Sequence, residues 1–464
     1  MKKSREEVPG SFRDPSGFLF LKDGILYRQV NSYYRDDYDH LMVSGLYSRL
    51  TGSGLLIPHN EMPPSYAEKE GAYKVLKPEP VAFVSYPYEW CFSQLKDAAL
   101  ATLQIQKIAV EYGMTLKDAS AYNIQFHHSR PLLIDTLSFE KLGQVKPWVA
   151  YRQFCQHFLA PLLLMAYRDH RCGRMLRLNI DGIPLDLCSK LLPRFTRFVP
   201  GISMHIHMHA LSQRRYAARR IDTGDRKIGK TALLGIIDSL ESLIKKAKIR
   251  IKKSEWGEYY ADTNYSPRGF DQKQKILKIF LDKTAPAVVW DLGANTGIFS
   301  RIAAESGCLT ISFDMDMIAV ELSYRENLLE KQTRVLPLLL DFANPSPAIG
   351  WENKERLSFM DRGPVDTVIA LALIHHLAIS NNLPLEKTAI FFHRLCRYLI
   401  IEFVPKSDSQ VQRLLVTRKD IFHHYTTSDF ENEFSWYFDI LESEGIPDSQ
   451  RIIYLMRAKN TKDS

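Results

Sequence analysis

An acidic residue followed by a glycine-containing turn gives the segment Asp291-Leu-Gly-Ala-Asn-Thr-Gly297 its potential for chemistry. The segment follows the short apolar run 287–290 and precedes an amphipathic stretch, so we expect it to join a buried strand to a helix. Such a turn lets the backbone approach a ligand closely, because no side chain intervenes. A second acid, Asp314, ends the next apolar run 21 positions after Gly293. This spacing is close to the ~20 residues at which an acid meets a ribose hydroxyl, and it predicts a nucleoside-binding site.

The number of glycines in this turn separates two kinds of nucleoside ligand. A dinucleotide-binding turn has three glycines in the pattern GxGxxG, whereas only Gly293 and Gly297 are present here. The close approach of a pyrophosphate to the backbone requires the full pattern. S-Adenosylmethionine carries a sulfonium and no pyrophosphate, so the turn favours this cofactor over a dinucleotide.

Residues 287–458 resemble the class I S-adenosylmethionine-dependent methyltransferases, whose motif begins with an acid and continues x-Gly-x-Gly-x-Gly. Asp291, Gly293 and Gly297 match this motif, and Asn295 stands where the middle glycine is usual. Asparagine adopts the left-handed backbone conformation more readily than most residues, so we expect the turn to be retained.

The resemblance also implies roles for two acids at the ends of later strands. Asp314 would hold the ribose, and Asp341, which closes the apolar run 335–340, would lie beside the adenine. The segment Asn344-Pro-Ser-Pro347 resembles the Asn-Pro-Pro-aromatic motif of amino-methylating enzymes, but it follows the third strand rather than the fourth. We therefore interpret it as a turn, for which Asn-Pro is typical.

Two adjacent histidines, His375 and His376, follow the fourth predicted strand, where the acceptor usually lies in this family. Either one would suit the role of a general base that removes a proton from a hydroxyl acceptor. The alternative is that both rings pack under the following loop. Glu402, at the tip of the fifth predicted strand, is a further candidate for the base.

Short apolar runs alternate with helical patterns throughout the C-terminal part, which is the signature of a parallel sheet with crossover helices. The predicted strands are 287–292, 309–314, 335–340, 366–373, 398–404, 436–442 and 451–457. The last two resemble the reversed hairpin that closes methyltransferase sheets. We therefore predict an α/β fold, in which a Rossmann-like, seven-stranded methyltransferase sheet is preceded by an α+β kinase-like domain.

The kinase-like expectation rests on Asp118 and Asn123, which have the Asp-x4-Asn spacing of a catalytic loop, and on Asp135, which ends the apolar run 131–134. These residues resemble the catalytic loop and metal-binding strand end of protein-kinase-like and aminoglycoside-phosphotransferase-like enzymes. By resemblance, Asp118 would orient an acceptor hydroxyl, while Asn123 and Asp135 would hold magnesium with ATP. A hairpin at 18–30 and a buried strand at 81–85, which we predict upstream, agree with that order.

The N-terminal half also departs from the kinase pattern. No glycine-rich phosphate loop is visible, and the strand-three lysine has no clear counterpart, Arg28 being the nearest candidate. Leu116 and Lys117 replace the residues usual before the aspartate. Two readings stay open: an active phosphotransferase, and a kinase-like scaffold that binds the acceptor or a nucleotide without chemistry.

The length of 464 residues, with 45% hydrophobic and 25% charged residues, predicts a soluble globular protein of two or three domains. We place a kinase-like domain at 1–210, a basic helical linker at 211–255 and a methyltransferase domain at 256–464. The net charge is +8, and the basic residues concentrate between 214 and 253. This stretch is either a site for a phosphate-rich partner, nucleic acid included, or a solvated helical face.

Six cysteines occur singly, and His205-Ile-His-Met-His209 lacks a nearby acid or cysteine, so we predict neither disulfides nor a metal site. No apolar run reaches the length of a bilayer span and the N-terminus has no apolar signal core, so we expect a cytoplasmic protein without a membrane span.

The whole chain resembles bacterial nodulation-type methyltransferases that have a kinase-like N-terminal half. We therefore predict an S-adenosylmethionine-dependent methyltransferase that O-methylates a sugar or another small polar acceptor. The alternatives are a bifunctional phosphotransferase-methyltransferase that acts on a glycan, and a nucleic-acid methyltransferase that uses the basic linker.

Overall fold

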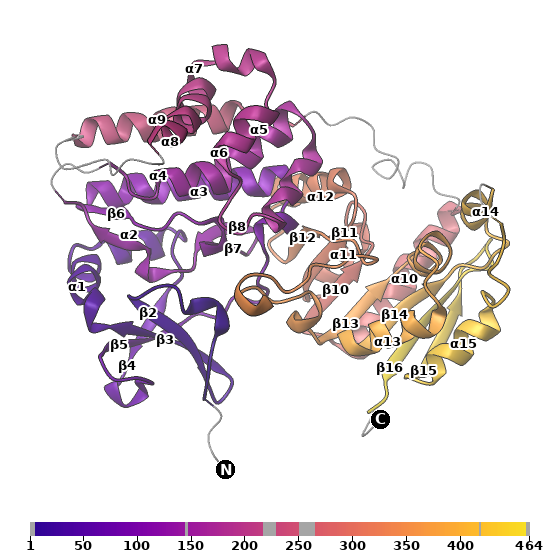
Figure 1. The fold of residues 1–464 in the computed structure, drawn as a ribbon. Coiled ribbons are helices and arrows are strands. Elements are labelled where there is room, and N and C mark those ends of the chain that lie inside the picture. The colour runs from indigo at the N-terminus through magenta and orange to yellow at the C-terminus, as the bar shows by residue number, and fades with distance from the viewer. Residues whose placement is uncertain (1–4, 144–146, 217–228, 250–264, 417–418, 461–464) are drawn as a thin grey trace. The chain divides into compact units, whose positions relative to one another are not determined.

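The computed structural model describes residues 5–143, 147–216, 229–249, 265–416 and 419–460 (Figure 1). The chain divides into two compact units. Unit 1 comprises Met1–Arg250 and the segment Ile349–Arg356, and unit 2 comprises Ile251–Ala348 and Leu357–Ser464.

Unit 2 is built on a seven-stranded sheet with the order β12-β11-β10-β13-β14-β16-β15. Its strands are β10 (Val288–Leu292), β11 (Leu309–Asp314), β12 (Val335–Leu339), β13 (Val365–Ala370), β14 (Cys396–Phe403), β15 (Phe438–Gly445) and β16 (Ile452–Ala458). The first five strands are parallel, β16 runs antiparallel to β14, and β15 runs antiparallel to β16. Each of the seven predicted ranges overlaps one of these strands.

Helices connect the strands of unit 2 (Figure 1). They are α10 (Pro267–Thr284), α11 (Ile298–Glu305), α12 (Met317–Leu329), α13 (Leu385–Leu395), α14 (Ser409–Leu415) and α15 (Thr427–Ser435). Apolar residues of α10 and α11, such as Phe280 and Phe299, pack with Val289 and Ile400 of the sheet in one buried cluster. The central strands are apolar along their whole length because helices cover both faces of a parallel sheet.

The direction in which successive strands are added to the sheet reverses between β10 and β13, which makes this position the switch point of the sheet. From β10 the chain proceeds outward to β11 and β12, whereas β13 leads outward on the other side to β14. In open parallel sheets, ligands bind at the carboxyl ends of the strands where the strand order reverses. The loops that follow β10 and β13 are therefore where a ligand site is expected.

Unit 1 contains a five-stranded antiparallel sheet with the order β1-β2-β3-β5-β4 and two two-stranded sheets, β6-β9 and the hairpin β7-β8. The strands are β1 (Arg5–Glu7), β2 (Gly17–Lys22), β3 (Ile25–Asn31), β4 (His59–Met62), β5 (Ala72–Pro78), β6 (Met114–Leu116), β7 (Ile124–His127), β8 (Arg130–Leu133) and β9 (Phe139–Lys141). The hairpin predicted at 18–30 is confirmed, and its turn contains Asp23 and Gly24 with positive φ.

Helices make up the rest of unit 1 (Figure 1). They are α1 (Arg35–Val43), α2 (Leu46–Gly52), α3 (Phe92–Glu111), α4 (Tyr151–Phe154), α5 (Ala160–Tyr167), α6 (Leu185–Leu191), α7 (Pro200–Ile202), α8 (His209–Tyr216) and α9 (Lys230–Lys246). Helix α9 packs along α3, and Lys107 of α3 pairs with Asp238 and Glu241 of α9. The apolar face of α9, which includes Ile237, is buried.

The buried strand predicted at 81–85 is wrong, because the segment has no strand partner. The side-chain amide of Gln125 takes the place of a neighbouring strand. Its Oε1 accepts from the Ser85 amide at 2.8 Å, and its Nε2 donates to the Ser85 carbonyl at 2.9 Å. A side chain therefore satisfies backbone groups that a strand would have paired with backbone.

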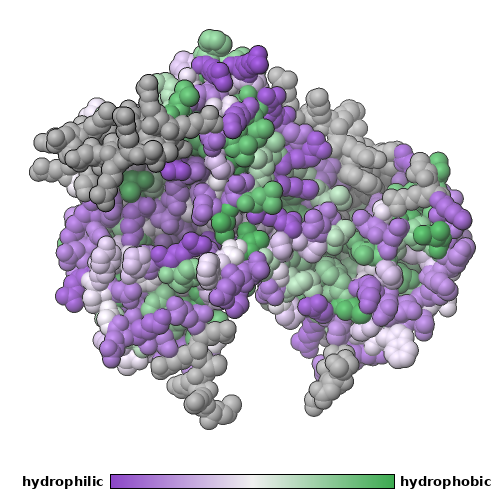
Figure 2. All heavy atoms as spheres, in the orientation of Figure 1, coloured by the Kyte–Doolittle hydropathy of each residue, from purple (hydrophilic) through white to green (hydrophobic). Residues whose placement is uncertain are grey.

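Hydrophilic residues cover much of the surface in view, and hydrophobic ones appear there in separate small groups (Figure 2). Among the described residues, no helix combines the length and the apolar character that crossing a membrane requires. Of the basic stretch, Lys245, Lys246 and Lys248 lie at the end of α9 or just beyond it, and Lys245 pairs with Glu241. Arg219, Arg220, Arg250, Lys252 and Lys253 lie outside the described residues.

Candidate active site

The loop between β10 and α11 has the backbone conformation that its sequence predicts. Gly293, Asn295 and Gly297 have φ values of 79°, 50° and 82°, so Asn295 adopts the left-handed conformation in the place of a glycine. A Cβ atom on Gly297 would lie 2.7 Å from Ser323 Oγ, and one on Gly293 would lie 3.2 Å from a Leu373 methyl. The two glycines are therefore required both by conformation and by space.

Asp314 is tied to this loop through backbone donors. Its Oδ2 accepts from the Asn295 amide and its Oδ1 from the Asp316 amide, both at 2.8 Å. The Gly293 and Ala294 amides donate to the Phe313 carbonyl at 2.9 and 3.0 Å. The ends of β10 and β11 are thereby held together. The Met315 amide also donates to this carboxylate, which leaves one of its roughly four acceptor positions for a further donor.

Two buried carboxyl groups lie in this part of the unit. Burial raises the pKa of Asp291 to about 7, although Ser300 Oγ donates to it at 2.5 Å. Burial also raises the pKa of Asp314 to about 6, against the effect of the backbone amides of Asp316, Asn295 and Met315, which lower it. A cationic ligand nearby would favour the ionised form of both carboxyl groups.

The residues at this edge fit an adenosyl cofactor with a cationic sulfonium. Ser323 Oγ and Asp316 Oδ2 are buried and have no hydrogen-bond partner among the described residues. Buried polar atoms are nearly always paired. Other buried atoms in the described part of this unit, such as Thr310 Oγ1 and Thr367 Oγ1, also lack a partner, so these two atoms are compatible with a ligand but do not by themselves indicate one. Ribose hydroxyls and an adenine amine supply the donors that such acceptors need.

Asp341 follows β12 at the same edge of the sheet. The Leu340 amide donates to the Asp314 carbonyl at 2.8 Å, which brings the end of β12 beside the end of β11. Asp341 accepts from the Ala343 amide at 2.9 Å, and its carbonyl accepts from the Asn344 amide at 3.0 Å. The turn therefore spans residues 341–344 and precedes the Asn-Pro segment, whose residues 345–347 form no turn themselves.

His375 and His376 follow β13, across the switch point from the glycine loop. The backbone at this place is unusual, because Ala372 has a positive φ of 51° and the π-helix η13 begins at His376 (His376–Ser380). Strained residues and π-helical turns concentrate at functional sites.

The two histidines differ in their surroundings, although their ring centroids lie only 4.1 Å apart. His375 is buried, and both of its ring nitrogens lack a partner among the described residues. Burial lowers its pKa well below the usual value. His376 is partly exposed, and burial together with the charge of Arg451 lowers its pKa to about 4. Both rings are therefore neutral at physiological pH, and only His376 reaches solvent.

Glu402 lies at the end of β14 inside a buried charge network. Lys273 of α10 contacts it at 2.7 Å, Arg451 at 3.5 Å, and the Tyr265 hydroxyl donates to it at 2.5 Å. Burial alone would raise the pKa of Glu402, but the two cations lower it below its usual value. Arg451 is held in turn by Asp408 at 2.7 Å. This geometry favours a structural role for Glu402.

The structure brings the three candidate residues of unit 1 together. Asp118 accepts from the Ser120 amide at 2.8 Å and is also hydrogen-bonded by the Asn123 side chain. The amide of Asn123 donates to Ser138 Oγ at 3.3 Å, and Ser138 Oγ donates to Asp135 at 2.8 Å. Burial raises the pKa of Asp118, and the nearby Asp135 adds to this shift.

A comparison with known proteins then decides the family. No protein-family model matches the chain. The chain is 35% identical over 455 residues to the nodulation protein NoeA of Rhizobium meliloti (strain 1021), which covers 96% of this chain and 95% of that protein. The chain belongs to the NoeA family of nodulation proteins. This membership confirms the expected likeness to nodulation-type proteins over both units.

Solved structures similar to this NoeA-family chain have lower identity. Magnesium protoporphyrin IX methyltransferase (ChlM) from Synechocystis PCC 6803 with bound SAM is 18% identical, with a TM-score of 0.31, and covers 44% of this chain and 89% of that chain. The bifunctional kinase-methyltransferase WbdD is 13% identical, with a TM-score of 0.31, and covers 44% of this chain and 42% of that chain.

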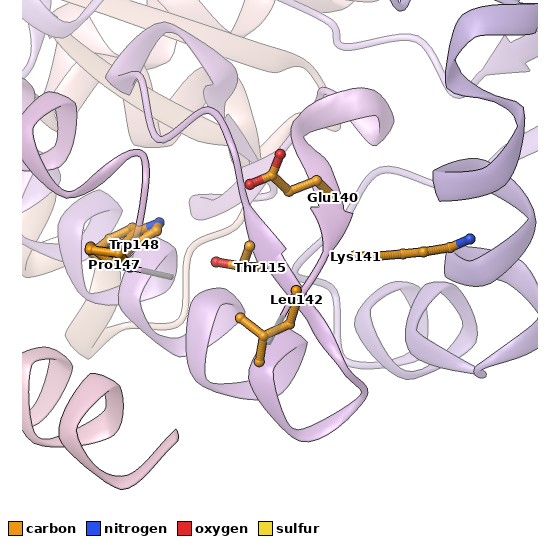
Figure 3. A pocket seen from close by; sticks show the side chains of 7 residues that line it. Thr115, Glu140, Lys141, Leu142, Pro147 and Trp148 are labelled. Carbon is orange, nitrogen blue, oxygen red and sulfur yellow. The ribbon is translucent and has the colours of Figure 1, made fainter. Parts of the chain in front are cut away.

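One small pocket of this NoeA-family chain lies in unit 1, between the two-stranded β6-β9 sheet and Trp148 (Figure 3). Thr115, Glu140 and Leu142 contribute to its lining, and the Lys141 side chain extends away from Trp148. None of the predicted site residues lines it. Within the ranges that the structure describes, no three His, Cys, Asp or Glu side chains are grouped to hold a metal ion.

Proposed function

We propose that this chain is an S-adenosylmethionine-dependent methyltransferase that methylates an oxygen of a sugar or another small polar acceptor. The observation that carries the proposal is the loop Asp291–Gly297 at the switch point, tied to Asp314 on the neighbouring strand. The cofactor supplies a methyl group activated by a sulfonium. The chain binds and orients the two reactants and excludes water from them.

The residues at the strand ends support distinct roles in binding. Asp314 offers its remaining acceptor position to a ribose hydroxyl, and Asp341 lies beside it for the adenine. Gly293 and Gly297 let the backbone approach the ligand. The buried Asp291 carboxylate stabilises a positive charge at this edge, because opposite charges attract strongly where water is excluded.

Replacing Asp314 with Ala is expected to weaken S-adenosylmethionine binding about ten- to a hundredfold, because a charge-assisted hydrogen bond is lost, worth roughly 1.5–3 kcal/mol. Isothermal titration calorimetry measures the change. Asp282→Ala removes an exposed acid of α10 in the same unit and is the matched control, with wild-type affinity expected. Equal affinities for wild type and Asp314→Ala would show that Asp314 does not hold the cofactor.

Binding of the cofactor is also expected to weaken at acidic pH. Because burial raises the pKa of Asp314 to about 6, the carboxylate that accepts a ribose hydroxyl becomes protonated as the pH falls through this value. Affinity should be about fourfold lower, or more, at pH 5.5 than at pH 7.5, from the ionised fraction of this group. Asp314→Asn, which does not titrate, should give a flatter profile. An affinity that rises toward low pH would contradict this role.

The acceptor hydroxyl needs a base, and we assign this role to His376. Burial and Arg451 lower its pKa to about 4, so the ring is neutral at physiological pH and would take the hydroxyl proton only transiently, during methyl transfer. Its partial exposure lets that proton leave to solvent. His375 lies beside it, fully buried, and supports the loop. Glu402 is the less suitable base, because Lys273 and Arg451 compete for its oxygens.

For the N-terminal half we propose a kinase-like scaffold at 1–210, followed by the basic linker at 211–255 and the methyltransferase domain at 256–464, in a cytoplasmic protein. The hydrogen-bonded set of Asp118, Asn123 and Asp135 supports the scaffold. Magnesium-dependent nucleotide binding by the chain would favour the bifunctional phosphotransferase-methyltransferase. Salt-sensitive binding of RNA or DNA would favour a nucleic-acid methyltransferase that uses the linker.

A further inference from the structure

An arginine of unit 1 contacts Asp135, the acid that would hold magnesium in a kinase-like site. Arg28, on β3, places its guanidinium 2.9 Å from Asp135 Oδ1 and 3.4 Å from Asp14 Oδ2. The side chains of Arg28 and Asp135 are only 13% and 14% exposed, so solvent screens the pair weakly. Arginine remains charged at every physiological pH, so this positive charge is permanent.

The other oxygens of the predicted metal site are engaged as well. Asp135 Oδ1 also accepts from the Leu137 amide at 3.0 Å, and its Oδ2 accepts from Ser138 Oγ at 2.8 Å. Asp118 accepts from the Ser120 amide at 2.8 Å and from the Asn123 side chain. Magnesium demands near-octahedral oxygen ligands at about 2.0–2.1 Å, so it would have to displace the Arg28 guanidinium from Asp135 Oδ1 and compete with these donors.

A second cation, Lys117, adds positive charge near the predicted metal site. Lys117 directly precedes Asp118, and its ammonium lies 2.5 Å from Ser16 Oγ, 3.8 Å from Asp14 and over the ring of Tyr34. A divalent ion at Asp135 would therefore bind beside one resident cation and near another. Like charges at short range in a partly buried site repel strongly. The residues present do not fit a magnesium ion.

We infer that Arg28 holds the place of the metal ion, so that Asp135, Asn123 and Asp118 form a metal-free, charge-compensated site. The inference rests on the proposed kinase-like scaffold, because that likeness makes these residues metal ligands. It separates the two interpretations of unit 1: any ligand that contacts these three residues binds without magnesium, and phosphoryl transfer assisted by a metal ion does not occur there. The cofactor site of unit 2 plays no part in it.

Titration of the full-length protein with Mn²⁺, followed by electron paramagnetic resonance of the free ion, tests this inference. Wild type is expected to bind no Mn²⁺ at this site. Arg28→Gln, which removes the charge and keeps a hydrogen-bonding side chain, should gain one site that is at least tenfold tighter than any in wild type. Asp135→Asn in the Arg28→Gln background should abolish the new site. Arg28→Lys, which keeps the charge, should behave as wild type.

Arg49→Gln removes an exposed arginine of the same unit and controls for the loss of one surface charge. The inference would be overturned if wild type binds one Mn²⁺ and Asp135→Asn does not. This comparison does not depend on whether an Arg28 variant folds. A folded Arg28→Gln protein without a new site would also overturn it. S-Adenosylmethionine binding, measured on the same samples, reports on the proposed methyltransferase function separately.

Discussion

Replacing His376 with Gln should lower turnover by about 10²–10⁴-fold, the range typical of a positioned general base, while the melting temperature and the cofactor affinity stay near their wild-type values. A hydroxyl is a poor nucleophile until its proton is removed. His376 is the partly exposed ring of the pair, and its low pKa of about 4 keeps it unprotonated near neutral pH. Steady-state kinetics, thermal melting and calorimetry on the same preparation measure the three quantities.

His375→Gln is the matched control, because the two rings are neighbours and His375 is fully buried with no partner for either nitrogen. This variant should lose stability first, and its activity should fall only in proportion to the folded protein. If both Gln variants turn over like wild type, neither ring is the base. If His375→Gln alone abolishes turnover at full stability, the assignment to His376 is wrong.

Replacing Glu402 with Gln should lower the free energy of unfolding by about 3–5 kcal/mol, the usual cost of removing one partner from a buried ion pair. The change leaves Lys273 buried, only 2% exposed, without its carboxylate partner at 2.7 Å. Arg451 keeps its contact with Asp408, so most of the expected loss arises at Lys273. Urea denaturation followed by circular dichroism measures the loss.

An exposed ion pair of the same unit provides the comparison. Lys283 and Glu442 are 47% and 36% exposed, and exposed pairs are worth about 0–1 kcal/mol. Glu442→Gln should therefore shift the unfolding midpoint little. A Glu402→Gln protein with wild-type stability and greatly reduced turnover would contradict the structural role of Glu402 and identify it as the base instead.

The local part of the candidate cofactor site could be predicted from the sequence because it depends on residues that are close together in the chain. The acid, the glycines and Asn295 act through backbone conformation, and the spacing to Asp314 follows from the length of one helix and one strand. Alternating apolar runs located the strands for the same reason, since a buried parallel strand is apolar throughout. The apolar runs therefore predict that Asp314 and Asp341 each follow a strand, and in the structure both lie at the same edge of the sheet.

The charge networks could not be predicted, because they join residues that are distant in the sequence. Lys273 lies 129 positions from Glu402. Its spacing places it on the apolar face of α10 with Ile276 and Leu277, but the sequence does not show which carboxylate it meets there. The pairing of Arg28 with Asp135 likewise depends on how β3 packs in the folded unit. The strand predicted at 81–85 failed because the side chain of Gln125, distant in sequence, supplied the hydrogen bonds.

Calorimetric titration of the full-length wild-type protein with S-adenosylmethionine tests the proposed function most directly. We expect one molecule to bind per chain, and S-adenosylhomocysteine to compete for the same site, because the loop after β10 and Asp314 recognise the adenosyl part that both share. A folded wild-type protein that binds neither compound would contradict the assignment of this chain as a methyltransferase.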